Sequence, residues 1–339
     1  MPAVRPPWMR LPPYTVHARY TAQQLTERIP WQIADYQVPN AWPVTQGAGV
    51  KVGVIDTGCD DVHAEQGDLS GAVAEWKDFS GSRRGPRDAD GHGTHVAGII
   101  AARRNAKGLV GVAPEAKIYV AKALGDDGSG TMDAVAAGIY WCLERGARVI
   151  NMSLGGTQED PVLRAAIKAA IAAGVTVVCA AGNEGGAVDF PGRWPECLAV
   201  SAVDKLRRIA PFSCRGEEVD VAAPGVEILS TFRGGTYASL SGTSMAAPFV
   251  AGLVALHLAT ENGKAAKLAD VLAWLTRTAT DAGKPGRDPL YGVGLPGPRA
   301  FERDAPPPPK IADPAPSNGV LRLRFPAGGT VTIAGGVPE

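Results

Sequence analysis

The amino-acid sequence predicts an α/β fold, a three-layer sandwich in which helices cover both faces of a mainly parallel sheet. Two observations lead to this prediction. Short apolar runs rich in β-branched residues alternate with helical patterns from residue 50 to about residue 280. Each run has the length of a buried strand, and strands that alternate with helices form parallel sheets with both faces covered.

Six runs are predicted to be strands, because each is apolar and bounded by turn-forming residues. In chain order they are Lys51–Asp56, Lys117–Leu124, Arg148–Ser153, Val175–Ala181, Cys197–Val203 and Val219–Ala222. Two helices are expected between them. One carries Met132, Val135, Ile139 and Leu143 at helical spacing, and the other is the alanine-rich run Pro161–Ala173. Functional side chains are expected at the carboxyl ends of the strands, which is where the sites of such sheets lie.

The composition excludes several classes of protein. The 339 residues include 34 Lys and Arg against 34 Asp and Glu, so the chain lacks the basic excess typical of proteins that bind nucleic acid or membrane surfaces. Its five cysteines form no C-x-x-C pair, which indicates neither a disulfide framework nor a thiolate zinc site. The start of the chain lacks the apolar segment of a secretion signal, and no run of about 20 apolar residues is present. We therefore expect a cytoplasmic protein with reduced thiols.

Three parts are expected along the chain. Residues 1–25 form an extension rich in proline and arginine, residues 26–303 form one folded domain, and residues 304–339 form a tail. In the tail, Asp304–Lys310 is a stiff proline-rich spacer. The runs Val320–Phe325 and Thr330–Ile333 then predict a β-hairpin, which we expect to dock on another surface because an isolated hairpin is marginally stable.

Three segments place a reactive side chain among glycines and other small residues. Asp56 closes an apolar strand, where a buried carboxylate needs a partner. His92 opens a helical stretch, and Ser244 lies where a loop gives way to an apolar helix, beside free backbone N–H groups. Together they supply a base, an acid that orients it and a nucleophile. The segments are Val54–Gly58, Asp90–Gly98 and Ser241–Pro248.

Each residue alone has an ordinary explanation as a strand-end acid, a loop histidine or a helix-capping serine. Their joint occurrence in the order acid, histidine, serine on an α/β chain favours a hydrolase. The alternative to an active enzyme, a binding module that is catalytically silent or self-inhibited, stays open. His92 and His95 lack the glutamate of the zinc motif H-E-x-x-H, which argues against a metallohydrolase. The run Gly47–Gly49 precedes its strand instead of following it, which argues against dinucleotide binding.

On these motifs the sequence resembles the subtilisin-like serine proteases, or subtilases, over about Ile29–Thr280. The resemblance implies a serine endopeptidase that acts on protein or peptide substrates. It also implies that Asp56, His92 and Ser244 are the catalytic triad. His95 would then be the second histidine of its motif and not the base.

A fourth segment, Val177–Gly185, is similar to the oxyanion-hole motif of the same family. The resemblance implies that the Asn183 side-chain amide donates to the oxyanion of the tetrahedral intermediate. The backbone N–H of Ser244 and the Thr243 hydroxyl are the other donors expected. Taken alone, the Asn-Glu-Gly sequence at this place would indicate only a turn.

The family builds its first specificity pocket from two backbone walls and a base. Aligning Phe190-Pro-Gly192 with the family's aromatic-Pro-Gly sequence places Asp189 at the base, with Glu184 at the rim. A carboxylate there predicts a preference for Lys or Arg before the scissile bond. The alternative is that Asp189 points into solvent from a surface loop. The expected walls are Ser153, Leu154 and Gly155 on one side and Ala180, Ala181 and Gly182 on the other.

The family likeness also implies a calcium site in the loop from residue 103 to residue 109. The oxygen donors would be the side chains of Asp68 and Asn105 and that of Glu27, which suit a hard cation. The positive charges in this loop would have to point away from the ion. The backbone carbonyls expected to complete the site are those of Arg103, Lys107 and Leu109.

Within the family the sequence resembles the intracellular branch, whose short N-terminal extension carries the motif Leu-Ile-Pro-Tyr. Here that motif is Leu11, Pro12, Pro13 and Tyr14, with Pro12 in place of Ile. The likeness implies a self-inhibited precursor (zymogen) whose own extension binds in the active site until it is cut, near Arg19, since proline fixes φ and has no N–H. The alternative is a disordered tail. Intracellular relatives are commonly dimers, which favours a homodimer.

Overall fold

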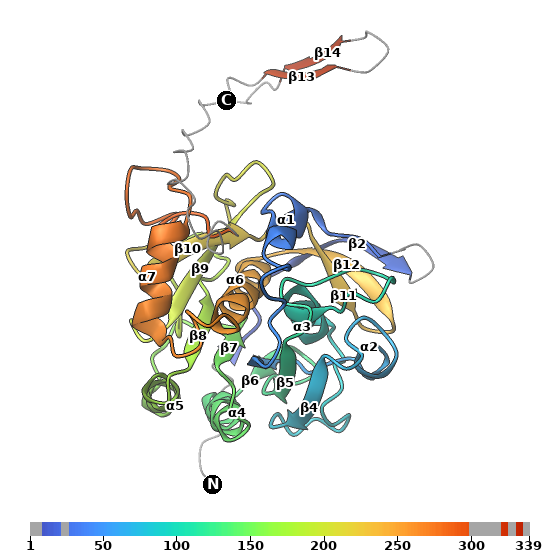
Figure 1. Ribbon diagram of the computed structural model, residues 1–339, viewed down its shortest axis with the longest axis vertical. Helices are drawn as coiled ribbons and strands as arrows, with labels where there is room; N and C mark the ends of the chain where they lie inside the picture. The colour runs from blue at the N-terminus through green and yellow to red at the C-terminus, as the bar shows by residue number, and fades with distance from the viewer. Residues whose placement is uncertain (1–8, 22–26, 298–319, 325–329, 335–339) are drawn as a thin grey trace.

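The computed structural model describes residues 9–21, 27–297, 320–324 and 330–334. Its centre is a sheet of seven strands, all parallel, in the order β10-β9-β8-β7-β3-β5-β4 (Figure 1). The predicted fold class is confirmed. The strands are β3 (Lys51–Asp56), β4 (Val73–Asp78), β5 (Lys117–Lys122), β7 (Val149–Met152), β8 (Thr176–Ala180), β9 (Leu198–Val203) and β10 (Val219–Pro224).

All six predicted strands are present, with ends that differ by one or two residues. The seventh, β4, was missed because its alternating residues include Glu75 and Lys77, and it pairs only with β5 at the edge of the sheet. One face of an edge strand meets solvent, so its polar residues gave no apolar run to detect. The five central strands β3, β5, β7, β8 and β9 are almost wholly buried, as their composition predicted.

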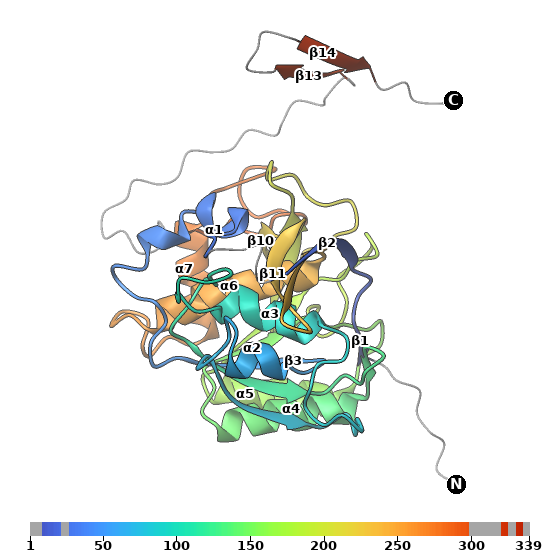
Figure 2. The same ribbon diagram turned by 90° about the vertical axis from the view of Figure 1, so that its right-hand side faces the viewer.

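Helices cover both faces of the sheet and give the three layers (Figure 2). The predicted helices α4 (Met132–Glu144) and α5 (Pro161–Ala172) pack together on one face, and begin at the capping side chains of Thr131 and Asp160. On the other face lie α3 (His92–Ala101) and α6 (Thr243–Leu258), which pack against each other. Helix α6 is buried along its whole length. The remaining helices are α1 (Trp31–Ala34), η2 (Val38–Asn40), α2 (Asp61–Glu65) and α7 (Leu268–Thr278).

Two smaller sheets include residues of the N-terminal extension. In one, β2 (Thr15–Thr21) pairs antiparallel with β12 (Thr236–Ser241), which also pairs with β11 (Ile228–Phe232). In the other, β1 (Met9–Arg10) pairs with β6 (Ser129–Gly130). None of these strands was predicted. The extension was expected to lie in the active site, with a disordered tail as the alternative, and no strand was assigned to it. The strand conformation of these residues comes from pairing with distant segments and not from a local apolar pattern.

The expected hairpin of the tail is present. Strands β13 (Val320–Arg324) and β14 (Thr330–Ala334) pair antiparallel, with Val320 opposite Ala334. The proline-rich spacer and the hairpin turn lie outside the described residues. The surface on which the hairpin would dock stays an open prediction.

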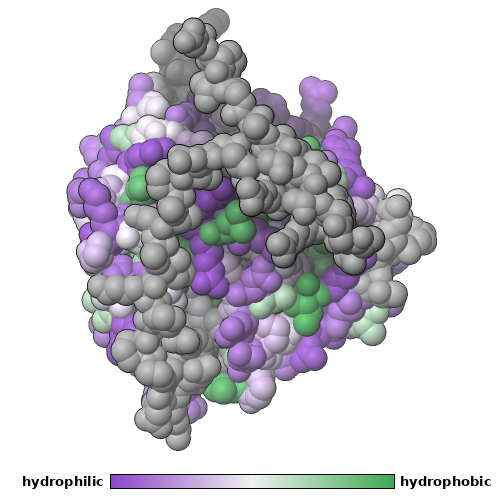
Figure 3. Space-filling view, turned by 90° about the horizontal axis from the view of Figure 1, so that it is seen from above, coloured by the Kyte–Doolittle hydropathy of each residue, from purple (hydrophilic) through white to green (hydrophobic). Residues whose placement is uncertain are grey.

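The surface and the cysteines add two observations. The visible described surface in Figure 3 is mainly hydrophilic, with separate apolar side chains. Among the described residues, no helix combines the length and the apolar character needed to cross a membrane. All five cysteines are free thiols and are buried. They therefore act as small apolar side chains within the core.

Candidate active site

The three predicted catalytic residues lie at the ends of secondary-structure elements. Asp56 is the last residue of β3, His92 is the first residue of α3, and Ser244 is the second residue of α6. All three are fully buried. The start of α3 lies close against the end of β3, since a Cβ at Gly93 would lie 2.3 Å from the carbonyl oxygen of Gly58. Only glycine permits this approach.

The acid and the base are joined directly. His92 Nδ1 lies 2.7 Å from Asp56 Oδ1, which also accepts the backbone N–H of Thr57 at 2.8 Å. Because a carboxylate oxygen accepts, Nδ1 carries the proton, and Nε2 of the neutral ring is left as the basic atom. Nε2 is buried and has no hydrogen-bond partner among the described residues. Ser244 Oγ instead donates to the carbonyl of Ser153, at 3.3 Å.

The surroundings set the pKa of the histidine. Burial by itself lowers the pKa of His92, but the charge and hydrogen bond of Asp56, together with the charges of Asp90 and Asp88, raise the pKa above its ordinary value. His95 differs, since burial lowers its pKa to about 3. Its Nε2 lies 3.0 Å from the carbonyl oxygens of Ile228 and of Ala238. These contacts favour a structural role for His95.

The side-chain amide of Asn183 is held at the start of α6. Its Oδ1 accepts the backbone N–H of Thr243 at 2.8 Å and the Thr243 hydroxyl at 2.7 Å. This orients Nδ2, which donates to the main-chain carbonyl of Pro13 at 2.8 Å. Thr243 therefore donates its single hydroxyl proton to Asn183. We had expected this hydroxyl to be an oxyanion donor, but here it positions the Asn183 amide.

The N-terminal extension lies along this site. Arg10 exchanges two backbone hydrogen bonds with Gly155, at 3.2 and 3.1 Å, and the N–H of Leu11 donates to the carbonyl of Gly128 at 3.0 Å. The segment is thus held between two stretches of backbone. Gly155 belongs to a predicted wall, whereas Gly128 was missed. The glycine-rich run that follows β5, Gly125 to Gly130, was the available signal, since such runs let another backbone approach closely.

Beyond Pro13 the extension contacts the catalytic histidine. The Tyr14 hydroxyl donates to Asp90 Oδ1 at 2.8 Å, and the Tyr14 ring centre lies 5.2 Å from that of His92. Three residues later, His17 Nε2 lies 2.7 Å from the Ser241 hydroxyl. Strand β2 then continues along β12. The extension therefore spans the site from Gly155 to the strand that precedes Ser244.

Asp189 lies between the two predicted pocket walls. A Cβ at Gly182 would lie 2.6 Å from Asp189 Oδ2, and one at Gly155 would lie 3.1 Å from Asp189 Cβ. The side chain therefore does not point freely into solvent. Burial, followed by the charge and hydrogen bond of Glu184, raises the pKa of Asp189 to about 6. Asp189, Glu184 and Gly155 line a pocket together with Arg10, Pro12, Gly156, Thr157 and Gln158.

The remaining wall residues are buried and belong to the ends of the central strands. Ser153 and Leu154 follow β7, and Ser153 Oγ donates to the carbonyl of Ser244 at 2.8 Å. Ala180 closes β8, and the carbonyl of Ala181 accepts the N–H of Asp189 at 2.9 Å. The walls therefore connect the pocket directly to the main chain around Ser244.

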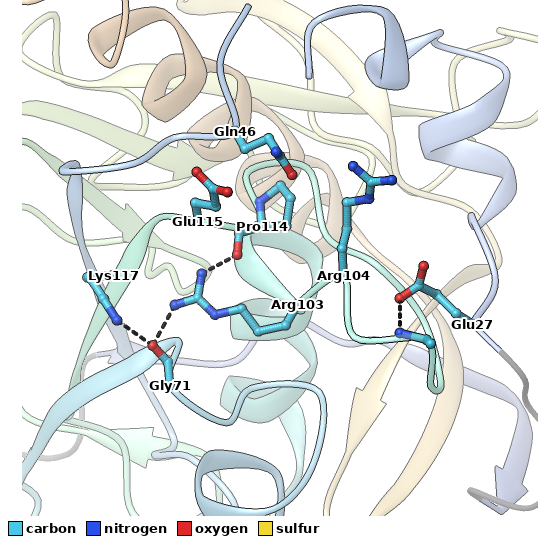
Figure 4. A pocket seen from close by; sticks show the side chains of 9 residues that line it. Glu27, Gln46, Gly71, Arg103, Arg104, Pro114, Glu115 and Lys117 are labelled. Atoms are coloured by element: carbon cyan, nitrogen blue, oxygen red, sulfur yellow. Dashed lines mark hydrogen bonds between the residues drawn. The ribbon is translucent and has the colours of Figure 1, made fainter. Parts of the chain in front are cut away.

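The guanidinium groups of the proposed calcium loop are engaged with other parts of the protein. Arg103 donates to the carbonyls of Pro114 and Gly71 (Figure 4). The Arg104 guanidinium lies 5.0 Å from the ring centre of Trp42. Two of the three positive charges of this loop, those of Arg103 and Arg104, are therefore directed to other parts of the protein, as a cation site would require.

The oxygen atoms of this loop fit a cation only in part. Asp68 is buried, and its Oδ2 accepts the N–H of Leu109 at 2.8 Å and the Tyr237 hydroxyl at 3.0 Å. The predicted carbonyls of Arg103, Lys107 and Leu109 accept no backbone hydrogen bond within the described part of the chain. Glu27 is different, since its Oε2 accepts the backbone N–H groups of Asn105 and Ala106, both at 2.7 Å. Glu27 therefore stabilises the backbone of the loop.

Comparisons with known proteins agree with this geometry. Residues 47–294 match the model of the subtilase family. An intracellular serine protease of Paenibacillus polymyxa is 45% identical over 244 residues, which are 69% of this chain and 74% of the relative. Subtilisin Savinase of Lederbergia lenta is 41% identical over 271 residues, 79% of this chain and 97% of the relative. Thermitase of Thermoactinomyces vulgaris is 44% identical over 234 residues, 68% of this chain and 82% of the relative.

The family match covers most of the chain and includes all three reactive residues at the ends of β3, α3 and α6. The relatives named above are proteases, and the parallel sheet with helices on both faces is the architecture that the family likeness implied. The chain therefore belongs to the subtilase family and is a serine endopeptidase.

Proposed function

We propose that this protease cleaves peptide bonds with Asp56, His92 and Ser244 as its triad and with Asn183 in the oxyanion hole. The observation that carries the proposal is the Asn183 amide, which already holds a main-chain carbonyl at 2.8 Å in the cleft. In the reaction, His92 Nε2 takes the Ser244 proton as Oγ attacks the substrate carbonyl. Asp56 keeps the proton on Nδ1 and stabilises the imidazolium that forms.

The backbone N–H of Ser244, in the first turn of α6, is proposed as the second oxyanion donor. N–H groups at the start of a helix lack intrahelical acceptors and carry partial positive charge. His92 returns its proton to the leaving amine. Water then attacks the acyl group, with His92 again as the base, and the proton is returned to Ser244 as the acyl group leaves. Labelling of Ser244 by a fluorophosphonate tests this function, and the expected result is argued in the Discussion.

We further propose that the chain is made as a self-inhibited precursor. Residues 10–14 use the backbone of Gly155 and Gly128 as an added peptide strand would, and this is how an extended substrate would bind. Pro12 and Pro13 have fixed φ and lack the N–H groups that an ordinary substrate could donate to the backbone of the cleft. Cleavage near Arg19 would then be the first step of activation.

The pocket around Asp189 supports a preference for Lys or Arg before the scissile bond. Within the described residues no cation forms an ion pair with this carboxylate, and its neighbour Glu184 adds a second negative charge. A cationic side chain that enters the pocket loses water, and pairing with a carboxylate compensates for that loss. The charges of Arg193 and Arg10 lower the pKa of Asp189 without forming an ion pair with it, and an uncharged side chain would bring no positive charge of its own to the two acids.

Replacing Asp189 by asparagine is expected to lower the ratio of kcat/KM for Arg- over Phe-terminated peptides by about 10- to 100-fold, the value of one charge-assisted hydrogen bond. Since its pKa is about 6, the carboxylate is charged above pH 6 and protonated below. The ratio should therefore fall as the pH drops through about 6. Using the ratio cancels the titration of His92, which affects both substrates. In Glu184→Gln this midpoint should move to lower pH. A ratio at or below one in the unaltered enzyme would contradict the preference.

We propose that the loop from residue 103 to residue 109 binds a structural Ca²⁺. Asp68 and Asn105 would supply side-chain oxygens, and Arg103, Lys107 and Leu109 would supply carbonyls. Glu27, which would instead support the loop, is left out of this ligand set. When bound, the ion would neutralise the buried Asp68 carboxylate and hold the loop against it.

Calcium removal is expected to lower the melting temperature of the full chain by about 5–10 °C, because an ion at 100 times its Kd adds about 2.7 kcal/mol. Melting would be followed with calcium and with excess chelator. Asp68→Asn should lose this response. Glu27→Gln should keep it, since a glutamine oxygen still accepts the two loop N–H groups. An unaltered chain that melts at the same temperature in both solutions has no such site.

We propose that the enzyme acts in the cytoplasm, and the Paenibacillus relative is named an intracellular serine protease. The five buried thiols with no disulfide support a reducing compartment. A homodimer and the absence of nucleic-acid or membrane partners stay predictions from the family likeness and the neutral charge. Sedimentation of the full chain would measure the oligomeric state.

A further inference from the structure

The buried carboxylate of Asp88 accepts five hydrogen bonds beside the triad. Its Oδ1 accepts the Thr57 hydroxyl at 2.8 Å, the Gly91 N–H at 2.8 Å and the Asp90 N–H at 3.2 Å. Its Oδ2 accepts the N–H and the hydroxyl of Thr94, at 2.8 and 2.7 Å. Three of these donors are backbone N–H groups and cannot accept in return, so the five hydrogen bonds favour the ionised carboxylate and oppose the burial that raises the pKa of Asp88. Among the described residues, none of the hydrogen bonds of Asp88 reaches the N-terminal extension or a triad side chain.

The partners of Asp88 belong to the two elements that carry the acid and the base. Thr57 directly follows Asp56, and its N–H donates to Asp56 Oδ1 at 2.8 Å. The Thr57 hydroxyl oxygen accepts the N–H of Gly93 at 2.9 Å, and its carbonyl accepts Lys122 Nζ at 2.6 Å. Thr57 therefore connects the end of β3 with the first turn of α3. Asp88 holds this connection from the loop that precedes the helix.

The same carboxylate fixes the start of α3. The N–H groups of Gly91 and Thr94 flank His92, so their hydrogen bonds to Asp88 fix the start of the helix and the direction of the His92 side chain. A buried network with every member satisfied is rigid, and loss of one acceptor leaves several donors unpaired. On the basis of the proposed triad, we infer that Asp88 is a positioning residue that fixes Asp56 and His92 relative to each other through Thr57 and the first turn of α3.

Replacing Asp88 by asparagine tests this inference. Nδ2 of the new side chain cannot accept the Thr94 N–H, so the network opens. In the full chain, kcat at steady rate is expected to fall about 10- to 100-fold, as for other groups that orient a catalytic residue, with KM changed by less than about twofold. Fluorophosphonate labelling would count the active sites of each preparation.

A second measurement separates positioning from mere stability. The acidic groups around His92 are Asp56, Asp90 and Asp88, with the Tyr14 hydroxyl also close, and each acid raises the histidine pKa. In Asp88→Asn one negative charge is lost, so the pKa of His92 should fall. Nitrogen NMR of the full chain with labelled histidine would follow this titration without relying on turnover. The acid limb of kcat/KM should shift in the same direction.

The control is Asp288→Asn. Asp288 is also a buried carboxylate that accepts backbone N–H groups, from Lys284, Leu290 and Tyr291 at 3.0, 2.7 and 2.9 Å. It should lower the melting temperature but leave kcat and the His92 titration unchanged. If both variants behave alike, the inference is wrong.

Thr57→Val provides a second test where Asp88→Asn does not fold. Valine matches threonine in shape but lacks the hydroxyl that joins Asp88 to the strand end, so kcat should fall with KM nearly unchanged. An unchanged kcat in this variant overturns the inference. Failure of the proposed triad would look different, because the unaltered chain would then not be labelled at Ser244.

Discussion

Replacing Ser244 by alanine is expected to lower the turnover of a peptide substrate by at least about 10⁴-fold and to abolish labelling by a fluorophosphonate. The nucleophile and its general base act as one unit, so loss of the hydroxyl removes both the covalent step and the proton transfer to His92. The oxyanion hole and the substrate cleft are left intact by this change. The variant should therefore still bind peptides.

The folded state should tolerate this change. Ser244 is buried, but its hydroxyl makes one long hydrogen bond, of 3.3 Å, to the Ser153 carbonyl. Alanine fills nearly the same volume, so the melting temperature should change by only a few degrees. Ser239→Ala is a matched control, since this serine is also buried but lies in β12, outside the triad. Labelling that persists in Ser244→Ala would show that another residue is the nucleophile.

A chain that begins at Ala22 is expected to hydrolyse peptides at least about 100-fold faster than the full chain measured before any cleavage. The extension is held in the cleft by the two Arg10–Gly155 bonds and by the bonds of Leu11, Pro13 and Tyr14 described above. Even at about 0.5–1 kcal/mol each, these five bonds favour the closed state by roughly 3 kcal/mol or more. That energy corresponds to about a hundredfold smaller fraction of open sites.

Two further measurements separate inhibition from a stability effect of the truncation. A synthetic peptide of residues 9–21 should inhibit the shortened chain, because it carries both the cleft contacts and strand β2. The full chain should show a lag before reaching its steady rate, and the variant that combines the full extension with Ser244→Ala should stay uncut. Equal initial rates for the full and the shortened chain would refute self-inhibition. Loss of folding in the shortened chain would be detected by its melting curve.

The catalytic motifs could be predicted from the sequence because each is local. Asp56, His92 and Ser244 lie within short runs of glycine and small residues, at the end of an apolar strand or the start of a helix. The central strands were predictable for the same reason, since burial on both faces leaves a continuous apolar run. Edge strand β4 was not predicted, because its charged residues interrupt the apolar run, and strands β11 and β12 were not predicted, because serines and threonines interrupt theirs.

The sequence by itself therefore determined the fold class and the order of the central strands along the chain, and it predicted which residues form the proposed triad. Only the tertiary structure decided what the distant segments do to one another: that the extension pairs with β12 and Gly155, that Asp189 lies between two walls, and that Asp88 joins the strand end to α3. The physical reason is the range of the interactions. Hydrophobic periodicity reports how a segment is buried, whereas a hydrogen bond between residues far apart in the chain leaves no periodic signal in either segment.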